Sequence, residues 1–395
     1  MASAKTIEIV KATVPVLAVH GEAITKTFYQ LLFERNPSLK NVFNMTHQAH
    51  GTQPRALANA VYAYAANIEN PAVLAKAITQ ITQKHTSLSV TPEMYNIVGT
   101  NLLEAIKIVL GDAATADIIN AWAEAYQELA NLLIGIEENI YQEAEQQEGG
   151  YRGQKNYTIV KKEEESSIIT SFYLKPSDNS AIPPFKAGQY VAVNVVIPDA
   201  EHTHTRNYSL SGCTTQNTLR ISVKKESGHP AGVVSNYLHE IAQVGDIIKL
   251  GIPAGEFVLE PTQKPIVLIA GGVGITPLMS MYMDLFHHAE NEVLFIQCAK
   301  NGEVHAFGQR SRQLADKKKS LKVISIYDEP LSTDQPDYNG LLTPEILKAN
   351  ISSLDAEYYF CGPVLFIKQV KQMLLSLEIP EGQLHYEFFG PSGDL

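Results

Sequence analysis

A glycine-rich turn in the last third of the chain is the first segment whose residue types and spacing point to chemistry. An apolar run leads into Gly271–Gly274, and Thr276 and Pro277 follow as the expected N-cap and first residue of a helix. Glycines let a backbone approach a pyrophosphate, and a helix N-terminus adds N–H donors and a favourable dipole. The spacing is GxGxTP rather than GxGxxG, so the turn alone fits an ordinary strand-to-helix connection as well as a nucleotide site.

A second candidate for chemistry is His85, in the first third of the chain. It lies on one predicted helix face together with the apolar residues Leu74, Ile78, Ile81 and Leu88. A histidine on a buried face needs a partner. The partner is either a backbone carbonyl, as for an ordinary core histidine, or an iron atom that the histidine holds as an axial haem ligand.

Residues suited to a flavin lie between these two motifs. Tyr190 ends the segment GQY, and Arg206 begins the segment RNYS. Tyrosine can stack on a flavin ring, and arginine can pair with a pyrophosphate oxygen. Gly232–Ser235 begin a short helix whose N-terminus could hold a second phosphate. Each of these residues, taken singly, equally fits a structural role in a strand, a turn or the surface.

The elements that must position these residues fall into three regions, of which the first is helical. Prolines stand where helices should start, at Pro37, Pro71 and Pro92. A long helix is predicted from Thr115 to Tyr141, with an apolar stripe formed by Ile118, Trp122, Ala125, Leu129, Leu132, Ile136 and Ile140. We expect an all-α domain over residues 1–147.

The second and third regions differ in hydrophobic period. From Tyr157 onward, six short β-branched segments with a period of two predict an antiparallel barrel or sandwich over residues 148–262. From Pro265 onward, four nearly continuous apolar runs with helices between them predict an α/β domain with a parallel sheet over residues 263–395.

Composition argues against several classes of protein. Lys and Arg total 31 against 42 Asp and Glu, which gives a net charge of -11, so nucleic acid and anionic lipid are not expected partners. The three cysteines, Cys213, Cys298 and Cys361, fit neither a disulfide framework nor a zinc site. No run reaches the roughly 18 apolar residues of a membrane span, and a signal-peptide pattern is missing. We expect a cytoplasmic protein.

Taken in order, the motifs from Tyr157 to the end of the chain resemble the ferredoxin–NADP reductase family. The resemblance implies that RNYS and GVVS hold FAD, that GxGxTP holds the nicotinamide cofactor, and that the turn Cys361–Pro363 lies beside the nicotinamide. Ala231 departs from a frequent GGxVS form of the second motif. The implied cofactor-binding residues are Tyr190, Arg206, Asn207, Tyr208, Ser209, Gly232, Val233, Val234, Ser235, Gly272, Val273, Gly274, Ile275, Thr276, Pro277, Cys361, Gly362, Pro363, Glu387, Phe388, Phe389, Gly390 and Pro391.

With the helical region included, the whole chain resembles the flavohaemoglobins, through FYQLLFERNP, QKHTS and YNIVG. The resemblance implies that His85 is the proximal haem ligand and that Tyr95 and Glu137 form a charge-relay pair beside it, with Lys84 nearby. It also implies that Phe43 contacts the haem. On the opposite, distal side it places the oxygen-facing residues Tyr29, Gln53 and Leu57.

Family members are typically nitric oxide dioxygenases, which convert nitric oxide and oxygen to nitrate with NAD(P)H. The resemblance therefore implies haem b, FAD and NADH or NADPH as cofactors, and oxygen and nitric oxide as small-molecule partners. A reductase of other acceptors or hydroperoxides, and an oxygen or nitric oxide sensor or store, stay open as alternatives. A store has little use for an attached reductase. A lipid or other hydrophobic ligand in the distal pocket also stays open, and a chain with all its redox centres needs no second subunit, so we expect a monomer.

Overall fold

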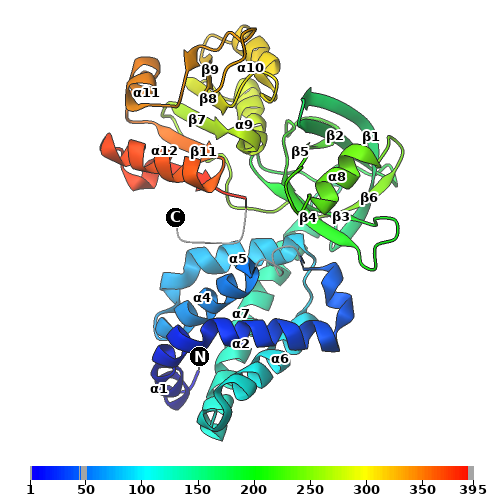
Figure 1. The fold of residues 1–395 in the computed structure, drawn as a ribbon, viewed down its shortest axis with the longest axis vertical. Coiled ribbons are helices and arrows are strands. Elements are labelled where there is room, and N and C mark those ends of the chain that lie inside the picture. The colour runs from blue at the N-terminus through cyan, green and yellow to red at the C-terminus, as the bar shows by residue number, and fades with distance from the viewer. Residues whose placement is uncertain (1, 44, 46–50, 390–395) are drawn as a thin grey trace.

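The computed structural model describes residues 2–43, 45 and 51–389. A helical domain lies at one end of the molecule, and the antiparallel and parallel sheets lie side by side at the other (Figure 1). Helix α5 (Ala75–Ser87) lies on the side of the helical domain that faces the sheets. Within the described ranges, no helix is long and apolar enough to cross a bilayer.

The helical domain confirms the predicted globin fold. Pro37 and Pro71 begin short 3-10 helices, and Pro92 begins an α-helix, because a residue without an N–H loses no bond in a first turn. Its α-helices are α1 (Ala4–Ala12), α2 (Val14–Arg35), α4 (Thr52–Ala66), α5, α6 (Pro92–Leu110) and α7 (Ala116–Gln146), and its 3-10 helices are η1 (Pro37–Asn41), η2 (Pro71–Leu74) and η3 (Gly111–Ala113).

The buried face of α7 differs from the predicted stripe in its second half. Leu132, expected to be buried, is 44% exposed. The buried positions run instead through Leu133, Glu137 and Tyr141. The prediction for Leu132 was wrong because the face is set by polar partners: Glu137 and Tyr141 both hydrogen-bond to groups inside the domain.

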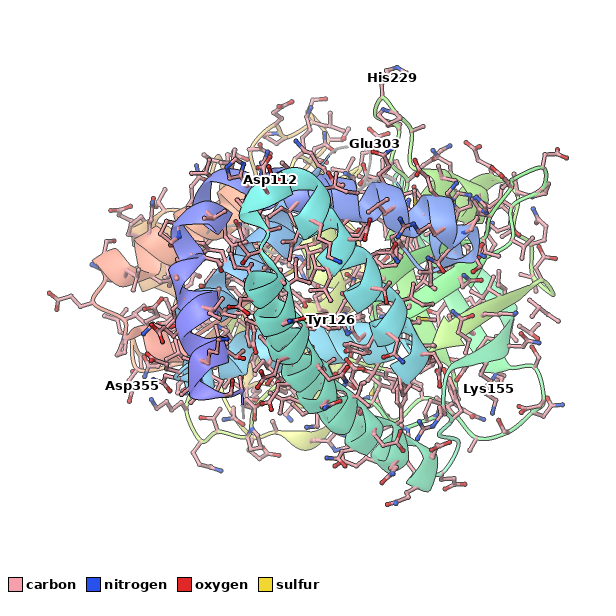
Figure 2. All side chains as sticks on the ribbon, turned by 90° about the horizontal axis from the view of Figure 1, so that it is seen from below. Asp112, Tyr126, Lys155, His229, Glu303 and Asp355 are labelled. Carbon is pink, nitrogen blue, oxygen red and sulfur yellow. The ribbon has the colours of Figure 1, made fainter. Side chains whose placement is uncertain are left out.

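Helices α6 and α7 run side by side from the turn that Asp112 marks, and Tyr126 lies on the long helix α7 (Figure 2). Gly99 on α6 makes this approach possible, because a Cβ there would collide with the ring of Tyr126. The Tyr126 hydroxyl donates to the carbonyl of Tyr95 at 2.6 Å. The contact therefore fixes the segment of α6 that carries Tyr95.

Six antiparallel strands form the second domain, as expected. Their order is β4-β3-β6-β1-β2-β5, and a bridge between Leu210 and Ile221 brings the end of β4 against the other edge strand. The inward side chains of the strands form one apolar cluster. The strands are β1 (Gln154–Ser166), β2 (Ile169–Pro176), β3 (Tyr190–Val195), β4 (His204–Ser209), β5 (Leu219–Lys224) and β6 (Ile247–Gly251), with helix α8 (Val233–Glu240) between β5 and β6.

The third domain is a parallel sheet of order β10-β9-β8-β7-β11-β12, with helices between its strands. Strands β10 and β12 were not anticipated, because their short segments lack a continuous apolar run. The strands are β7 (Ile266–Gly271), β8 (Val293–Ala299), β9 (Leu321–Tyr327), β10 (Tyr338–Asn339), β11 (Glu357–Cys361) and β12 (Leu384–Glu387); the helices are η4 (Gly272–Gly274), α9 (Ile275–His288), α10 (Gly308–Ala315), α11 (Pro344–Asn350), α12 (Val364–Ser376) and η5 (Glu381–Gln383).

The two seams between domains differ in kind. One apolar cluster contains barrel residues such as Ile169 and Phe257 together with Leu278 and Tyr282 of α9, so barrel and parallel-sheet domain share a core. Among the described residues, no apolar cluster joins the helical domain to either of the others. Hydrogen bonds of Asn41 and Gln83 join the helical domain to the barrel.

We predict that Gly99→Ala destabilises the protein by about 1–3 kcal/mol, because the added methyl group must displace the Tyr126 ring in a packed interface. Gly135→Ala is the matched control: it lies in α7 with open space around its Cβ position and should be neutral or stabilising by about 0.5–1 kcal/mol. Chemical denaturation of the full chain, followed by helical circular dichroism, measures both. Equal stability of the two variants would contradict the prediction.

Candidate functional site

Three helices bring His85, Tyr95 and Glu137 together. Nδ1 of His85 on α5 lies 2.9 Å from the Tyr95 hydroxyl and 2.9 Å from Oε1 of Glu137. The Tyr95 hydroxyl donates to the same carboxylate oxygen at 2.5 Å. Burial, followed by the hydrogen bond to Glu137, raises the pKa of Tyr95 well above its ordinary value, so Tyr95 remains a donor.

This arrangement determines which nitrogen of His85 carries the proton. The oxygens of Glu137 and Tyr95 both face Nδ1, so Nδ1 is the donor and Nε2 is the nitrogen left to bind a metal. The side chain of His85 is 32% exposed while that of Glu137 behind it is 5% exposed. An imidazole whose Nδ1 donates to a carboxylate can ligate a metal through Nε2.

The apolar interior of the helical domain fits a flat cofactor. It divides into two clusters, one built around Tyr29 and Leu32 and the other around Tyr95 and Leu133 on the His85 side. A histidine that is bonded through Nδ1 to a buried carboxylate and lies beside these apolar clusters fits an axial ligand of haem. The residues present therefore match the requirements of haem.

The residues predicted for the opposite wall also gather in one place. Tyr29 on α2 is buried, and its ring centroid lies 5.9 Å from those of Phe33 and Phe43. Leu57 packs against the same cluster. Gln53 is half-buried one turn earlier on α4, on the same helix face as Leu57.

The last turn of α5 packs on the barrel, next to the predicted flavin residue Tyr190. Oε1 of Gln83 accepts a hydrogen bond from the Gly255 backbone at 2.9 Å. A Cβ on Gly251 would collide with the Ser87 carbonyl, so glycine is required for this approach. Nζ of Lys84 lies 5.7 Å from the centre of the Tyr190 ring. The residue next to His85 therefore reaches the barrel strand β3.

Glu387 from the third domain reaches the same place. Burial raises the pKa of Glu387 to about 7, and the positive charge of Lys84 opposes this shift. Desolvation by nearby protein atoms lowers the pKa of Lys84 to about 8, although the residue as a whole is exposed, and the charge of Glu387 opposes that shift in turn. Burial and the Glu387 charge also raise the pKa of Tyr190. Lys84, Tyr190 and Glu387, one residue from each domain, therefore lie within electrostatic range of one another, which the sequence could not show.

The RNYS segment forms most of β4 and pairs with β3, so that Tyr190 lies opposite Ser209 and Val193 opposite Arg206. Alternation along the strand puts Arg206 and Tyr208 on one face and Asn207 and Ser209 on the other. The predicted flavin residues of β3 and β4 are thereby brought side by side.

The second predicted phosphate segment, Gly232–Ser235, begins α8, with Gly232 as its N-cap and Val233 and Val234 in its first turn. The Ser235 hydroxyl turns back to the Gly232 carbonyl at 3.3 Å. A Cβ on Gly232 would collide with that hydroxyl and with Cβ of Glu226, so a side chain here would force both to shift. The backbone N–H groups of this first turn point outward from the helix N-terminus, as a phosphate site requires.

The glycine turn after β7 lies directly against the turn after β11. A Cβ on Gly274 would collide with the carbonyl of Cys361 and the backbone of Gly362. Gly272 has a φ of 53° and open space at its Cβ position, as a backbone that approaches a pyrophosphate requires. Burial raises the pKa of Cys361 well above its ordinary value, so it is a neutral thiol.

The predicted helix start at this turn was wrong by two residues. Helix α9 begins at Ile275 with Gly274 as its N-cap, directly after the 3-10 turn that contains Val273. The Thr276 hydroxyl donates to the Val273 carbonyl at 3.1 Å instead of capping an N–H. The 3-10 turn begins at Gly272, so the chain is already helical before the Thr-Pro pair. Pro277 remains in the first turn, where proline is tolerated.

The C-terminal residues are only partly described. Phe388 packs against the core of the parallel-sheet domain, and Phe389 is 47% exposed. Pro363 is the N-cap of α12. Gly390 and Pro391, also predicted at the cofactor site, lie outside the described residues.

Family models match three segments of the chain. The Globin model matches residues 26–133, the Oxidoreductase FAD-binding domain model residues 156–259, and the Oxidoreductase NAD-binding domain model residues 268–372. Their order is the order of the three domains in the fold.

Full-length relatives carry the name flavohemoprotein. The protein from Halalkalibacterium halodurans is 46% identical over 402 aligned positions, covering 100% of this chain and 98% of its own. The protein from Bacillus subtilis is 47% identical over 393 positions, covering 98% and 97%.

Solved structures agree with these relatives. A flavohemoglobin from Malassezia yamatoensis with bound FAD and heme matches with a TM-score of 0.87 at 27% identity, over 98% of this chain and 99% of its own. The FAD/NAD-binding part of a nitric oxide dioxygenase from Vibrio cholerae matches with a TM-score of 0.56 at 32% identity, over 60% of this chain and 99% of its own.

We predict that Gly274→Ala raises the nicotinamide concentration needed for half-maximal flavin reduction by about tenfold or more, because the methyl group forces two adjoining turns apart. Gly382→Ala, with open space at its Cβ position in the same domain, is the matched control and should change nothing. Stopped-flow flavin absorbance without oxygen measures both variants. An unchanged concentration dependence in Gly274→Ala would show that the contact between the turns does not shape the site.

Proposed function

The chain belongs to the flavohemoprotein family, and we propose that within this family it is an NAD(P)H-dependent nitric oxide dioxygenase that converts nitric oxide and oxygen to nitrate. It is an oxidoreductase with a haem globin, an FAD domain and an NAD-binding domain. The finer proposal is carried by His85, which lies on α5, the helix that abuts the flavin barrel, and is bonded to the buried Glu137 carboxylate.

When bound, haem supplies the iron at which oxygen is activated, and FAD converts the two electrons of a hydride into single electrons. Nε2 of His85 would hold the iron, and the Glu137 carboxylate accepts the Nδ1 proton. A carboxylate partner makes the imidazole more electron-donating, which favours oxygen activation over storage. This is the reason for preferring an oxygenase to a store.

On the opposite side of the cofactor, the Tyr29 hydroxyl is the polar group among apolar neighbours. Together with Gln53 it would donate hydrogen bonds to oxygen as negative charge develops there. Phe43 and Leu57 would exclude water from the pocket. The residues thus divide into a donating proximal side and a charge-stabilising distal side.

The reductase half would deliver the electrons. Arg206–Ser209 and Gly232–Ser235 would hold FAD, and the turn Gly272–Pro277 with Cys361–Pro363 would hold the nicotinamide cofactor. Lys84, next to His85, reaches Tyr190 of the flavin barrel, so this contact would lie between the flavin and the haem.

We further assign the three domains to residues 1–147, 148–262 and 263–395, and place the protein in the cytoplasm as a monomer. Helix α7 ends at Gln146 and β1 begins at Gln154, on either side of the first boundary. All the cofactor-binding domains lie in one chain, so turnover needs no second subunit.

The decisive experiment is nitric oxide consumption by the purified, haem- and FAD-loaded protein in the presence of oxygen, with and without NADH or NADPH. We expect fast, cofactor-dependent consumption with nitrate as the product. Negligible consumption despite rapid flavin and haem reduction would overturn the dioxygenase assignment. It would then favour a reductase of other acceptors or a sensor.

We predict that Tyr29→Phe speeds oxygen dissociation by roughly tenfold to a hundredfold, because a hydrogen bond to a charged group is lost. Flavin reduction by NADH should be unchanged. Tyr64→Phe, which removes a hydroxyl bonded to the Ala125 carbonyl in the same domain, is the matched control. Flash photolysis measures the dissociation rate. An unchanged rate of oxygen dissociation in Tyr29→Phe would contradict the distal role of Tyr29.

We predict that Glu137→Gln lowers the iron–histidine stretching frequency, raises the haem reduction potential and slows nitric oxide consumption by about tenfold or more, because a neutral amide is a weaker acceptor. Tyr95→Phe keeps the direct contact between His85 and Glu137 and should lose less. Resonance Raman spectroscopy and redox titration measure the first two quantities. If both match the parent protein, Glu137 does not tune the histidine.

A further inference from the structure

Arg220 on β5 is the largest fully buried side chain of the described residues, with 0% of its surface exposed. A buried guanidinium is costly unless its N–H groups are bonded and its charge is compensated. Here Nε donates to Oγ of Ser211 at 3.1 Å, and Nη2 donates to the carbonyl of Ser211. Ser211 follows by two residues the end of β4, the strand that carries RNYS.

The other side of Arg220 faces the NAD-binding domain. Nη2 lies 3.6 Å from Sδ of Met283 on α9, the helix that begins at the glycine-rich turn. The guanidinium carbon lies 4.9 Å from the centre of the Phe307 ring. Arg220 therefore touches the strand that carries the flavin motif and the helix that carries the nicotinamide motif.

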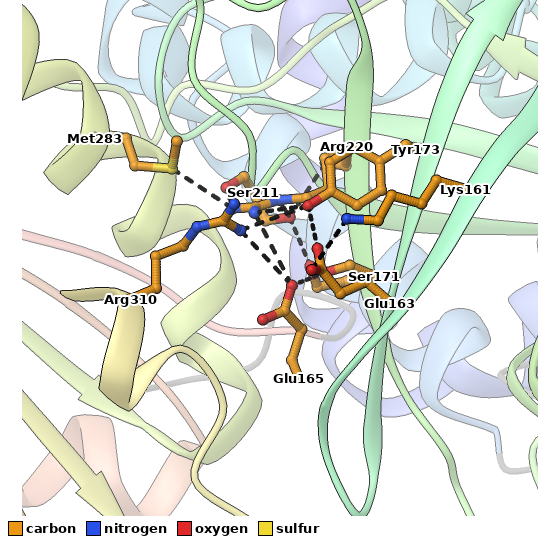
Figure 3. Close-up of polar contacts among 10 residues, drawn as sticks. Lys161, Glu163, Glu165, Ser171, Tyr173, Ser211, Arg220, Met283 and Arg310 are labelled. Carbon is orange, nitrogen blue, oxygen red and sulfur yellow. Dashed lines mark hydrogen bonds and ion pairs between the residues drawn. The ribbon is translucent and has the colours of Figure 1, made fainter. Parts of the chain in front are cut away.

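Charged residues of both domains complete the cluster, as Figure 3 shows. Oε1 of Glu165 on the barrel lies 4.0 Å from Arg220 and 3.9 Å from Arg310 of α10. Both arginines also reach the Tyr173 hydroxyl, at 3.5 Å each. Arg220 is 0% and Glu165 9% exposed, so solvent screens their contact little, whereas Arg310 is 36% exposed and its contact is screened more. The cluster joins the two domains by directional bonds, whereas the shared apolar core around it is non-directional.

Phe307 gives an independent sign that this joint is held under constraint. It is buried and has a φ of 61°, a left-handed conformation that is unfavourable for a bulky residue. Such a conformation persists only where the surroundings enforce it, and it often accompanies a functional geometry. The ring of Phe307, against the Arg220 guanidinium, leads directly into α10.

We propose that Arg220 is a positioning residue that fixes the NAD-binding domain on the flavin barrel in the geometry that hydride transfer requires. In that step the C–H bond of the reduced nicotinamide breaks, and its hydrogen and electron pair form a bond to the flavin. The product is NAD(P)⁺ and reduced flavin. Because the barrel carries one partner and the adjoining domain the other, an error of about 1 Å in the joint costs up to about a hundredfold in rate.

The proposal rests on the flavin-reduction step of the proposed function and does not involve nitric oxide or oxygen. The test uses the full-length protein loaded with haem and FAD, under nitrogen, in three variants: Arg220→Lys, Arg220→Met and Tyr173→Phe. Lysine keeps the charge but lacks the planar fork of donors. Tyr173→Phe removes the hydroxyl that both arginines reach and keeps the ring, so it guards against a failure of the Arg220 variants to fold.

Stopped-flow measurements with NADH and NADPH give the limiting rate of flavin reduction and the nicotinamide affinity separately. We expect Arg220→Lys to lower the limiting rate by about tenfold or more, with FAD and nicotinamide affinities within about twofold of the parent. We expect Tyr173→Phe to lower the limiting rate by a smaller factor, and Arg220→Met to lower it by at least as much as lysine. Arg152→Lys is the control, because Arg152 pairs with Glu138 and Glu145 away from this joint.

A second measurement needs no turnover. Amide hydrogen exchange of the FAD-loaded protein without nicotinamide should become faster at residues 302–312 and 211–212 in the Arg220 variants and stay unchanged in Arg152→Lys. An unchanged limiting rate in Arg220→Lys overturns the proposal. So does a rate loss that is fully matched by loss of FAD, because that result describes a structural role only.

Discussion

The packing of the last turn of α5 on the barrel is the contact on which the rest of the arrangement depends. Helix α5 carries His85, and the residue before it already lies beside β3. The approach is so close that position 251 admits no side chain. Because α5 serves both as the histidine wall of the globin and as its docking surface, the cofactor pocket and the domain seam cannot be arranged independently of one another. Glu137 and Tyr95 then hold the histidine from the globin side.

The overall fold could be predicted because each domain has its own hydrophobic periodicity in the sequence. The helical stripe, the alternating strands and the continuous apolar runs each come from short stretches of chain, and all three architectures were confirmed. The predictions were wrong where a contact with a residue distant in sequence determines which side chain is buried. Leu132 and Leu133 are equally apolar, and only the bonding of Glu137 inside the domain selects which one is buried. Similarly, α9 begins at Ile275, directly after the 3-10 turn Gly272–Gly274 and before the Thr-Pro signal.

The candidate site was predictable only as separate motifs. The meeting of the two glycine turns follows from the pairing of β7 with β11, which the motifs suggest but do not state. The approach of Lys84 to Glu387 joins residues about 300 positions apart, and their altered pKa values come from burial that only the folded chain creates. Arg220 lies in an ordinary alternating strand segment, and no neighbouring residue in the sequence indicates that its charge is compensated by Glu165 of β1.

The contrast between the two seams bears on how such a protein can arise by gene fusion. The barrel and the NAD-binding domain share one core, so neither would present a water-compatible surface without the other. The globin instead meets them through single polar contacts, such as those of Asn41 with Thr203 and of Gln83 with Gly255. A two-domain ancestor could therefore acquire, lose or exchange the globin domain, its electron acceptor, by recombination between residues 146 and 154 without exposing a large apolar surface. Because no apolar cluster of the described residues spans the globin seam, the globin could be exchanged between proteins as a unit. The barrel and the NAD-binding domain share a core and would have to be inherited together.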